Sequence, residues 1–101
     1  MDNIFIKYTG RTLEDWIEEN DEFYNGGGVN NPHACKIEFY QYFLENTDFI
    51  TAKIIEAQAL GLEIKDYSEV LLARQYARDQ VNKLEDIMEQ NNLQIAAMHN
   101  L

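Results

Sequence analysis

The chain has 101 residues, and its 18 Asp and Glu against 8 Lys and Arg give a formal net charge of −10. Such a charge repels nucleic-acid phosphates and anionic lipid, so it argues against direct binding to either and favours a basic protein surface as partner. Apolar residues make up 46% of the chain, which excludes a disordered acidic tail, and we expect one folded domain over residues 1–101.

The first predicted element lies over residues 3–8, where Ile4, Ile6 and Tyr8 occupy alternate positions. A period of two is typical of a strand with one buried face, so the sequence predicts a short strand here. A lone strand leaves its backbone donors and acceptors unpaired. We therefore expect it to pair with another chain or with a copy of itself, or to lie against helices as an extended arm.

A short acidic helix is predicted next, because Thr12 can cap a first turn that contains two acids. The helix is expected to continue to about Tyr24, with Leu13, Trp16 and Ile17 on its buried face. Its carboxylates then face water, and they come from Glu14, Asp15, Glu18, Glu19, Asp21 and Glu22. A loop rich in glycine over residues 25–31 follows this helix.

A long helix is predicted from Pro32 to Leu60, because Asn31 is a good cap and proline is favoured at the first helical position. Apolar residues step by three and four along one seam, at Tyr40, Phe43, Thr47, Ile50, Ile54 and Ala57. A second stripe contains Phe39, Tyr42 and Phe49, so we expect this helix to lie centrally. Asn46, Thr47 and Asp48 are poor helix formers, and a kink or break near them stays open.

A second long helix is predicted from about Tyr67 to Ala97, after a stop at Gly61 and a capping box over residues 66–69. The two long helices form an antiparallel hairpin of about 45 Å over residues 32–101, so the fold class is mainly α. Such a hairpin leaves apolar surface uncovered, which predicts a homodimer or higher oligomer. The predicted interface contains Val81, Leu84, Met88, Asn91, Ile95 and Met98. Asn91 either fixes the register of this interface or marks a frayed helix end.

The acidic, histidine and cysteine residues of this sequence do not form a recognisable catalytic or metal site. The acidic helix lacks the alternating ligands of a calcium loop, so a solvated face or a protein-docking face is expected there. His33 and Cys35 point to diverging sides of a helix, and nothing in the sequence orients them or His99. We therefore expect no enzymatic activity, no metal and no cofactor, and we expect Arg74 and Arg78 to pair with acids across the hairpin.

Two further features bear on the compartment. The single cysteine, Cys35, permits no intramolecular disulfide, which agrees with a reducing environment. No apolar run reaches the length of a membrane span, and the first residues lack the pattern of a signal peptide. The sequence therefore predicts a cytoplasmic protein.

Part of the hairpin resembles a known group of proteins. The segments that carry the resemblance are Phe43 to Ile50, Lys53 to Ala57, Tyr67 to Leu71, Arg74, Ala77-Arg78 and Val81 to Glu85. Over roughly residues 43–85 the chain is similar to a helical hairpin of small phage and prophage proteins that are often encoded near tail genes. The resemblance implies a phage origin and a bacterial host, and it does not extend to residues 1–31.

Two functions from different classes fit these observations. The first is a non-enzymatic acidic protein that binds a basic surface of a host protein in the host cytoplasm, as an inhibitor or an anionic mimic of nucleic acid. The six carboxylates of residues 14–22 carry the charge in this hypothesis, with Trp16 or Tyr24 as an anchor. The second is a structural or assembly component of a phage tail that self-associates through the hairpin.

Overall fold

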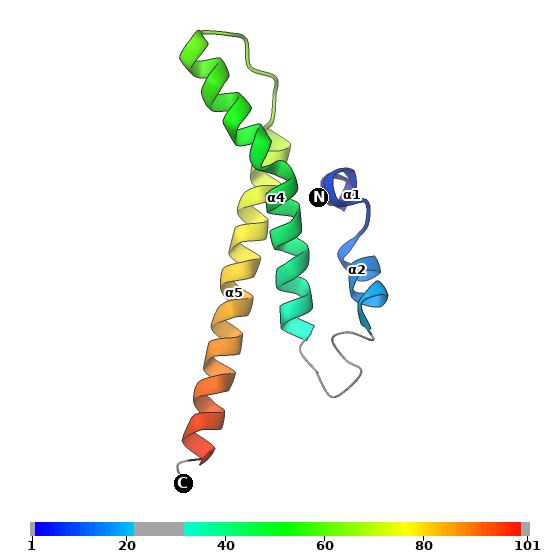
Figure 1. The fold of residues 1–101 in the computed structure, drawn as a ribbon, viewed down its shortest axis with the longest axis vertical. Helices are drawn as coiled ribbons and strands as arrows, with labels where there is room; N and C mark the ends of the chain where they lie inside the picture. Colours follow the sequence, from blue (N-terminus) through cyan, green and yellow to red (C-terminus); the bar gives the residue numbers. More distant parts are fainter. Residues whose placement is uncertain (1, 22–31, 100–101) are drawn as a thin grey trace.

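The computed structural model describes residues 2–21 and 32–99, and for residues 94–99 it describes the backbone alone. The described residues are mainly helical, as predicted, and form α1 (Asp2–Thr9), α2 (Leu13–Glu19), α4 (Pro32–Leu60) and α5 (Ser68–His99) (Figure 1). None of the helices in these ranges combines the length and apolarity that crossing a bilayer requires. Glu22, Tyr24 and the predicted glycine-rich loop lie outside the described residues.

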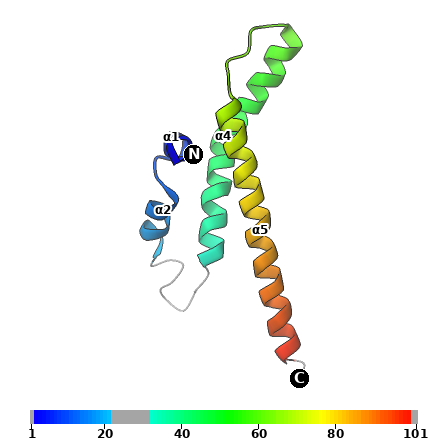
Figure 2. The ribbon, with the colours of Figure 1, turned by 180° about the vertical axis from the view of Figure 1, so that it is seen from behind.

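α4 and α5 form the predicted antiparallel hairpin, and both views show α1 and α2 along the side of α4 (Figures 1 and 2). α4 has 29 residues and α5 has 32, which correspond to about 43 Å and 48 Å at the helical rise per residue. The molecule is 62 Å long, more than either helix. The two helices are therefore offset: the last turns of α4 extend past the start of α5, and the end of α5 extends past the start of α4.

The predicted strand is wrong, because residues 2–9 form α1. Phe5 is the buried residue of this segment, with 5% of its surface exposed, whereas Ile6 is 42% exposed. Thr9 is also buried, and Tyr8 is half-buried, so the covered residues recur at the helical spacing of three and four. A helix satisfies its own backbone hydrogen bonds, so this segment needs no partner strand.

The core lies between α1, α4 and α5, and its largest fully buried side chains are Phe39, Phe43, Ile50 and Thr47. The predicted seam of α4 is confirmed, since Tyr40 is buried as well and Ile54 packs against the core from one side. Phe5 of α1 reaches this core, with its ring centroid 4.4 Å from that of Phe43. The second predicted stripe is buried only at Phe39, because Tyr42 and Phe49 are 38% and 49% exposed.

The turn at Asn46, Thr47 and Asp48 does not interrupt α4. Each of these polar side chains instead contacts another helix. Asn46 Nδ2 donates to the carbonyl oxygen of Tyr8 at 2.7 Å, at the end of α1. Thr47 Oγ1 and Asp48 Oδ1 accept hydrogen bonds from the Arg74 guanidinium of α5, at 2.6 Å and 2.9 Å. These poor helix formers join α4 to α1 and to α5.

Glycine ends two of the helices. Gly61 has φ +66° and follows α4, as the sequence predicts, and the amide of Leu62 donates to the carbonyl of Ala57 at 2.9 Å. A hydrogen bond from an amide to the carbonyl five residues before it is typical of a helix that ends at a glycine with positive φ. Gly10, with φ +81°, ends α1 in a similar way through a bond from its amide to the Ile6 carbonyl at 2.8 Å.

Candidate functional site

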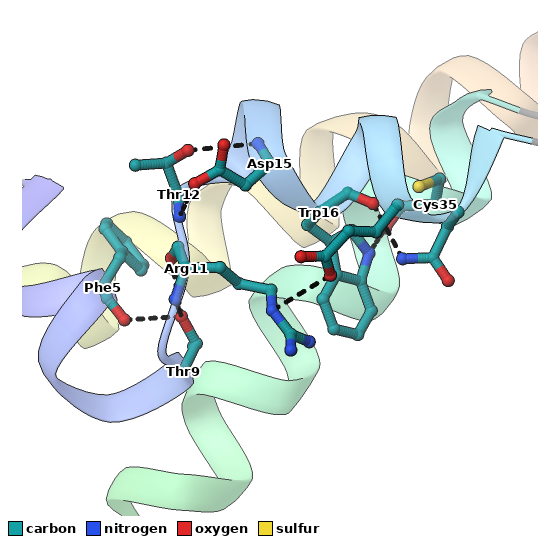
Figure 3. Close-up of polar contacts among 9 residues, drawn as sticks. Phe5, Thr9, Arg11, Thr12, Asp15, Trp16 and Cys35 are labelled. Atoms are coloured by element: carbon teal, nitrogen blue, oxygen red, sulfur yellow. Dashed lines mark hydrogen bonds and ion pairs between the residues drawn. The ribbon is translucent and has the colours of Figure 1, made fainter.

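The acidic helix α2 begins at a capping box. The Asp15 amide donates to Thr12 Oγ1 at 3.1 Å, and the Thr12 amide donates to the Asp15 carboxylate at 3.4 Å (Figure 3). These bonds satisfy backbone donors that a helix start leaves unpaired. The predicted cap is confirmed, although the described helix ends at Glu19.

Trp16 fastens α2 to α4. Its indole Nε1 donates to the carbonyl oxygen of Cys35 at 3.0 Å (Figure 3). The centroid of its ring lies 5.8 Å from that of Phe39 and 5.7 Å from that of Tyr42. The guanidinium of Arg11 lies over the same ring, 5.6 Å from its centroid. Trp16 is thus half-buried and engaged within the chain, and its role is to hold the acidic helix in place.

The carboxylates of α2 lie on its outer side, as the sequence predicts for Glu14, Asp15, Glu18 and Glu19, and Asp21 is exposed as well. Asp15 belongs to the capping box, and Glu19 pairs with Arg11 at 3.2 Å. Glu14 and Glu18 have no hydrogen bond or ion pair with any other described residue. Residues 2–21, the acidic front, hold six acids and two bases and so have a formal charge of −4.

A cavity of about 290 Å³ lies beside the acidic front. Its walls are aromatic rings from three helices: Phe5 of α1, Phe39 and Tyr40 of α4, and Tyr76 of α5. The remaining lining residues are Asp2, Thr12, Leu13 and Glu14. Sequence reasoning missed this site because its residues are spread over 75 positions of the chain and Phe5 was assigned to a strand.

The charges around the cavity act on Tyr40, whose side chain is buried. Burial raises the pKa of the Tyr40 hydroxyl, and the neighbouring Tyr76 and the carboxylates of Glu14 and Asp2 raise it further. Both carboxylates therefore place negative potential on the cavity as well as on the outer surface. Neither carboxylate has an ion pair with a described residue.

The residues of the predicted oligomer interface are not equivalent in the structure. Val81 and Leu84 are 9% and 8% exposed and belong to the core of a single chain, and Met88 packs against that core from its edge. Asn91 is exposed. The side chains of Ile95 and Met98 lie outside the described part of the structure.

The other reactive side chains of the described ranges do not assemble into a site. Burial raises the pKa of the Cys35 thiol, and Glu38 adds to the effect. His33 Nδ1 is buried without a hydrogen-bond partner among these residues. Arg74 pairs with Asp48 across the hairpin as predicted, whereas Arg78 binds Gln75 of its own helix. Within the same ranges, no three ligating side chains converge where they could hold a metal ion.

Comparison with known protein families, curated proteins and solved structures found no match to this chain. The acidic front and the aromatic cavity are the two features of its described residues that bear on function.

Proposed function

We propose that the chain is a non-enzymatic phage protein that binds a basic surface of a host protein in the host cytoplasm, as an inhibitor or an anionic mimic of nucleic acid. The observation that carries this proposal is the acidic front, where exposed carboxylates such as Glu14 and Glu18 have no described partner. Carboxylates of this kind pair with basic side chains of a partner and steer its approach.

The rigidity of α2 adds to this argument. The capping box and the bond from Trp16 to Cys35 fix the helix on α4 before any partner arrives. A charged surface that is ordered beforehand loses less conformational entropy on binding than a mobile acidic tail does. The acidic front is therefore a better candidate for specific recognition than the net charge alone would indicate.

Charge reversal at two locations tests the proposal. One variant carries Glu18→Lys and Asp21→Lys in the acidic front, and the control carries Glu56→Lys and Glu63→Lys at the far end of the hairpin. All four side chains are exposed, and both variants change the net charge equally. Each protein is used to capture partners from a bacterial lysate, bound proteins are eluted with salt and identified, and their affinities are measured.

We expect the unaltered chain and the control to retain the same basic protein, and the front variant to bind it about tenfold more weakly with a shallower salt dependence. Equal affinity for both variants would exclude a role for the acidic front. Duplex DNA is then added as a competitor for the captured protein. If DNA displaces the chain from that protein, the chain mimics nucleic acid. If DNA does not displace it, the chain inhibits without mimicking nucleic acid.

A second candidate function is self-association as a component of a phage tail. It is favoured by exposed apolar side chains where α4 extends past α5, at Ile55, Leu60, Leu62 and Ile64, which are 40–64% exposed. These four residues lie within ten positions of the chain, and contiguous exposed apolar surface marks interaction sites. Light scattering is expected to give a defined oligomer that Leu60→Lys with Leu62→Lys dissociates, and a monomer at all concentrations would exclude this function.

A further inference from the structure

The aromatic cavity is small. Pockets for small molecules usually occupy about 300–1,000 Å³, and this cavity, at about 290 Å³, lies at the lower limit. Its volume therefore suits a single extended group from a partner better than a large free ligand.

The cavity walls offer aromatic surface to that group. Tyr76 packs edge to face against Phe5 and Tyr40, with ring centroids 6.2 Å and 6.0 Å apart. Phe5 and Tyr40 are almost completely buried, whereas Tyr76 is 39% exposed. Tyr76 is thus the wall that an incoming group can reach. The face of an aromatic ring attracts cations, and planar cations can also stack on it.

Two carboxylates from different helices complete the lining. Asp2 comes from the first turn of α1 and Glu14 from the first turn of α2, and both are exposed and without an ion pair to any described residue. A guanidinium has five N–H donors in one plane, so it can bind both carboxylates while its face lies on a ring. An ammonium is more strongly hydrated and cannot stack, so it is the poorer fit.

We propose that this cavity receives the guanidinium of an arginine side chain on the bound partner. The inference rests on the proposed function, because it names the group through which the acidic front recognises a basic surface. Asp2, Glu14 and Tyr76 would then contact the partner directly. The other carboxylates of the acidic front would contribute long-range attraction only.

The first experiment uses the isotope-labelled full chain and two probes, N-acetyl-arginine amide and N-acetyl-lysine amide. Amide chemical shifts are expected to change around Phe5, Glu14 and Tyr76 with the arginine probe, with a dissociation constant in the millimolar range, as a single small contact gives. The lysine probe is expected to bind about fivefold more weakly. Shifts that are spread over all acidic residues, or equal affinity for both probes, would overturn the assignment.

Matched variants separate the cavity from general charge. Glu14→Gln and Tyr76→Leu are each expected to weaken the arginine probe about fivefold, whereas Tyr76→Phe keeps the ring and the affinity. Glu18→Gln is the control, because Glu18 is also an exposed glutamate of α2 without a described partner and does not line the cavity. Equal effects of Glu14→Gln and Glu18→Gln would refute a specific site.

The captured host protein provides the second arm of the test. If Glu14→Gln weakens its binding more than Glu18→Gln does, the cavity holds a side chain of the partner. If Glu14→Gln affects only the free arginine probe, the cavity serves a small molecule and the inference is overturned. The reversal of Glu18 and Asp21 tests the proposed function separately, since neither residue lines the cavity.

Discussion

Replacement of Thr47 by valine is expected to destabilise the unaltered chain but to have little or no cost when Arg74 is replaced by methionine. Thr47 is completely buried in α4, and its hydroxyl accepts a hydrogen bond from Arg74 at 2.6 Å and donates one to the Phe43 carbonyl at 2.8 Å. Valine has nearly the same shape but no hydroxyl, so Arg74 loses one of its three acceptors while remaining 8% exposed.

The magnitude follows from these contacts. A hydrogen bond to a charged group contributes about 1.5–3 kcal/mol, and the added buried methyl group offsets up to about 1 kcal/mol of that loss. Thr47→Val is therefore expected to lower the free energy of unfolding by about 1–2 kcal/mol. In the Arg74→Met background the hydroxyl has no buried donor to bind, so the same substitution is expected to cost about 0 kcal/mol or to stabilise the chain slightly.

Urea unfolding followed by circular dichroism at 222 nm measures all four proteins of this cycle. The coupling between the two positions is expected to be about 1–2 kcal/mol, within the range of residues in direct contact. Thr51→Val, at an exposed position one turn further along α4, is the control and is expected to change stability by less than about 0.5 kcal/mol. A cost for Thr47→Val that is the same in both backgrounds would refute the assigned role of the hydroxyl.

Further predictions concern the attachment of the front, the core and two titratable groups. Trp16→Phe removes the hydrogen bond to the Cys35 carbonyl, and we expect it to destabilise the chain by about 1 kcal/mol. Amide hydrogen exchange is expected to become faster in α2 than in the unaltered chain, with a smaller change in α5. Leu84→Asp places a charge at a core position that is 8% exposed, so we expect the variant to lose its cooperative unfolding transition. An oligomer that instead dissociates into folded monomers would contradict this expectation. The Ser68 hydroxyl and amide hold the pKa of Asp66 below its ordinary value, so its stabilising effect is present at neutral pH and is lost as the pH falls through the folded-state pKa. The difference in melting temperature between Asp66→Asn and the unaltered chain is therefore expected to narrow in acid, and a constant difference would exclude this cause. Cys35 is 2% exposed and burial raises the pKa of its thiol, so its reaction with a disulfide reagent at pH 8 is expected to be slower in the native chain than in urea, and equal rates would contradict this.

The long helices were predictable because their signals are repeated over many residues. Pro32 and Gly61 define α4 correctly, and the seam through Phe43 and Ile50 identified its buried face. The cap at Thr12 was also readable, since a hydroxyl and a carboxylate at fixed spacing specify it locally.

The short first helix was not predictable in the same way. Six residues with alternating apolar side chains fit a strand, whereas the burial of Phe5 and Thr9 depends on a surface that only the folded hairpin provides. The aromatic cavity shares this limit, because Phe5, Tyr40 and Tyr76 meet through packing between helices distant in sequence. Neither feature has a local sequence signature.

The turn of α4 at Asn46, Thr47 and Asp48 joins α1 to α5 through α4, so its contacts cannot all form until both of the other helices have been synthesised. Asn46 holds the end of α1, but the neighbouring contacts need Arg74, which is synthesised 66 residues after Tyr8. At a protein-synthesis rate of about 5–20 residues per second, about 3–13 s pass between the synthesis of these two residues. During that interval Phe5 has no complete core to enter, because Tyr76, against which its ring packs, is synthesised later still.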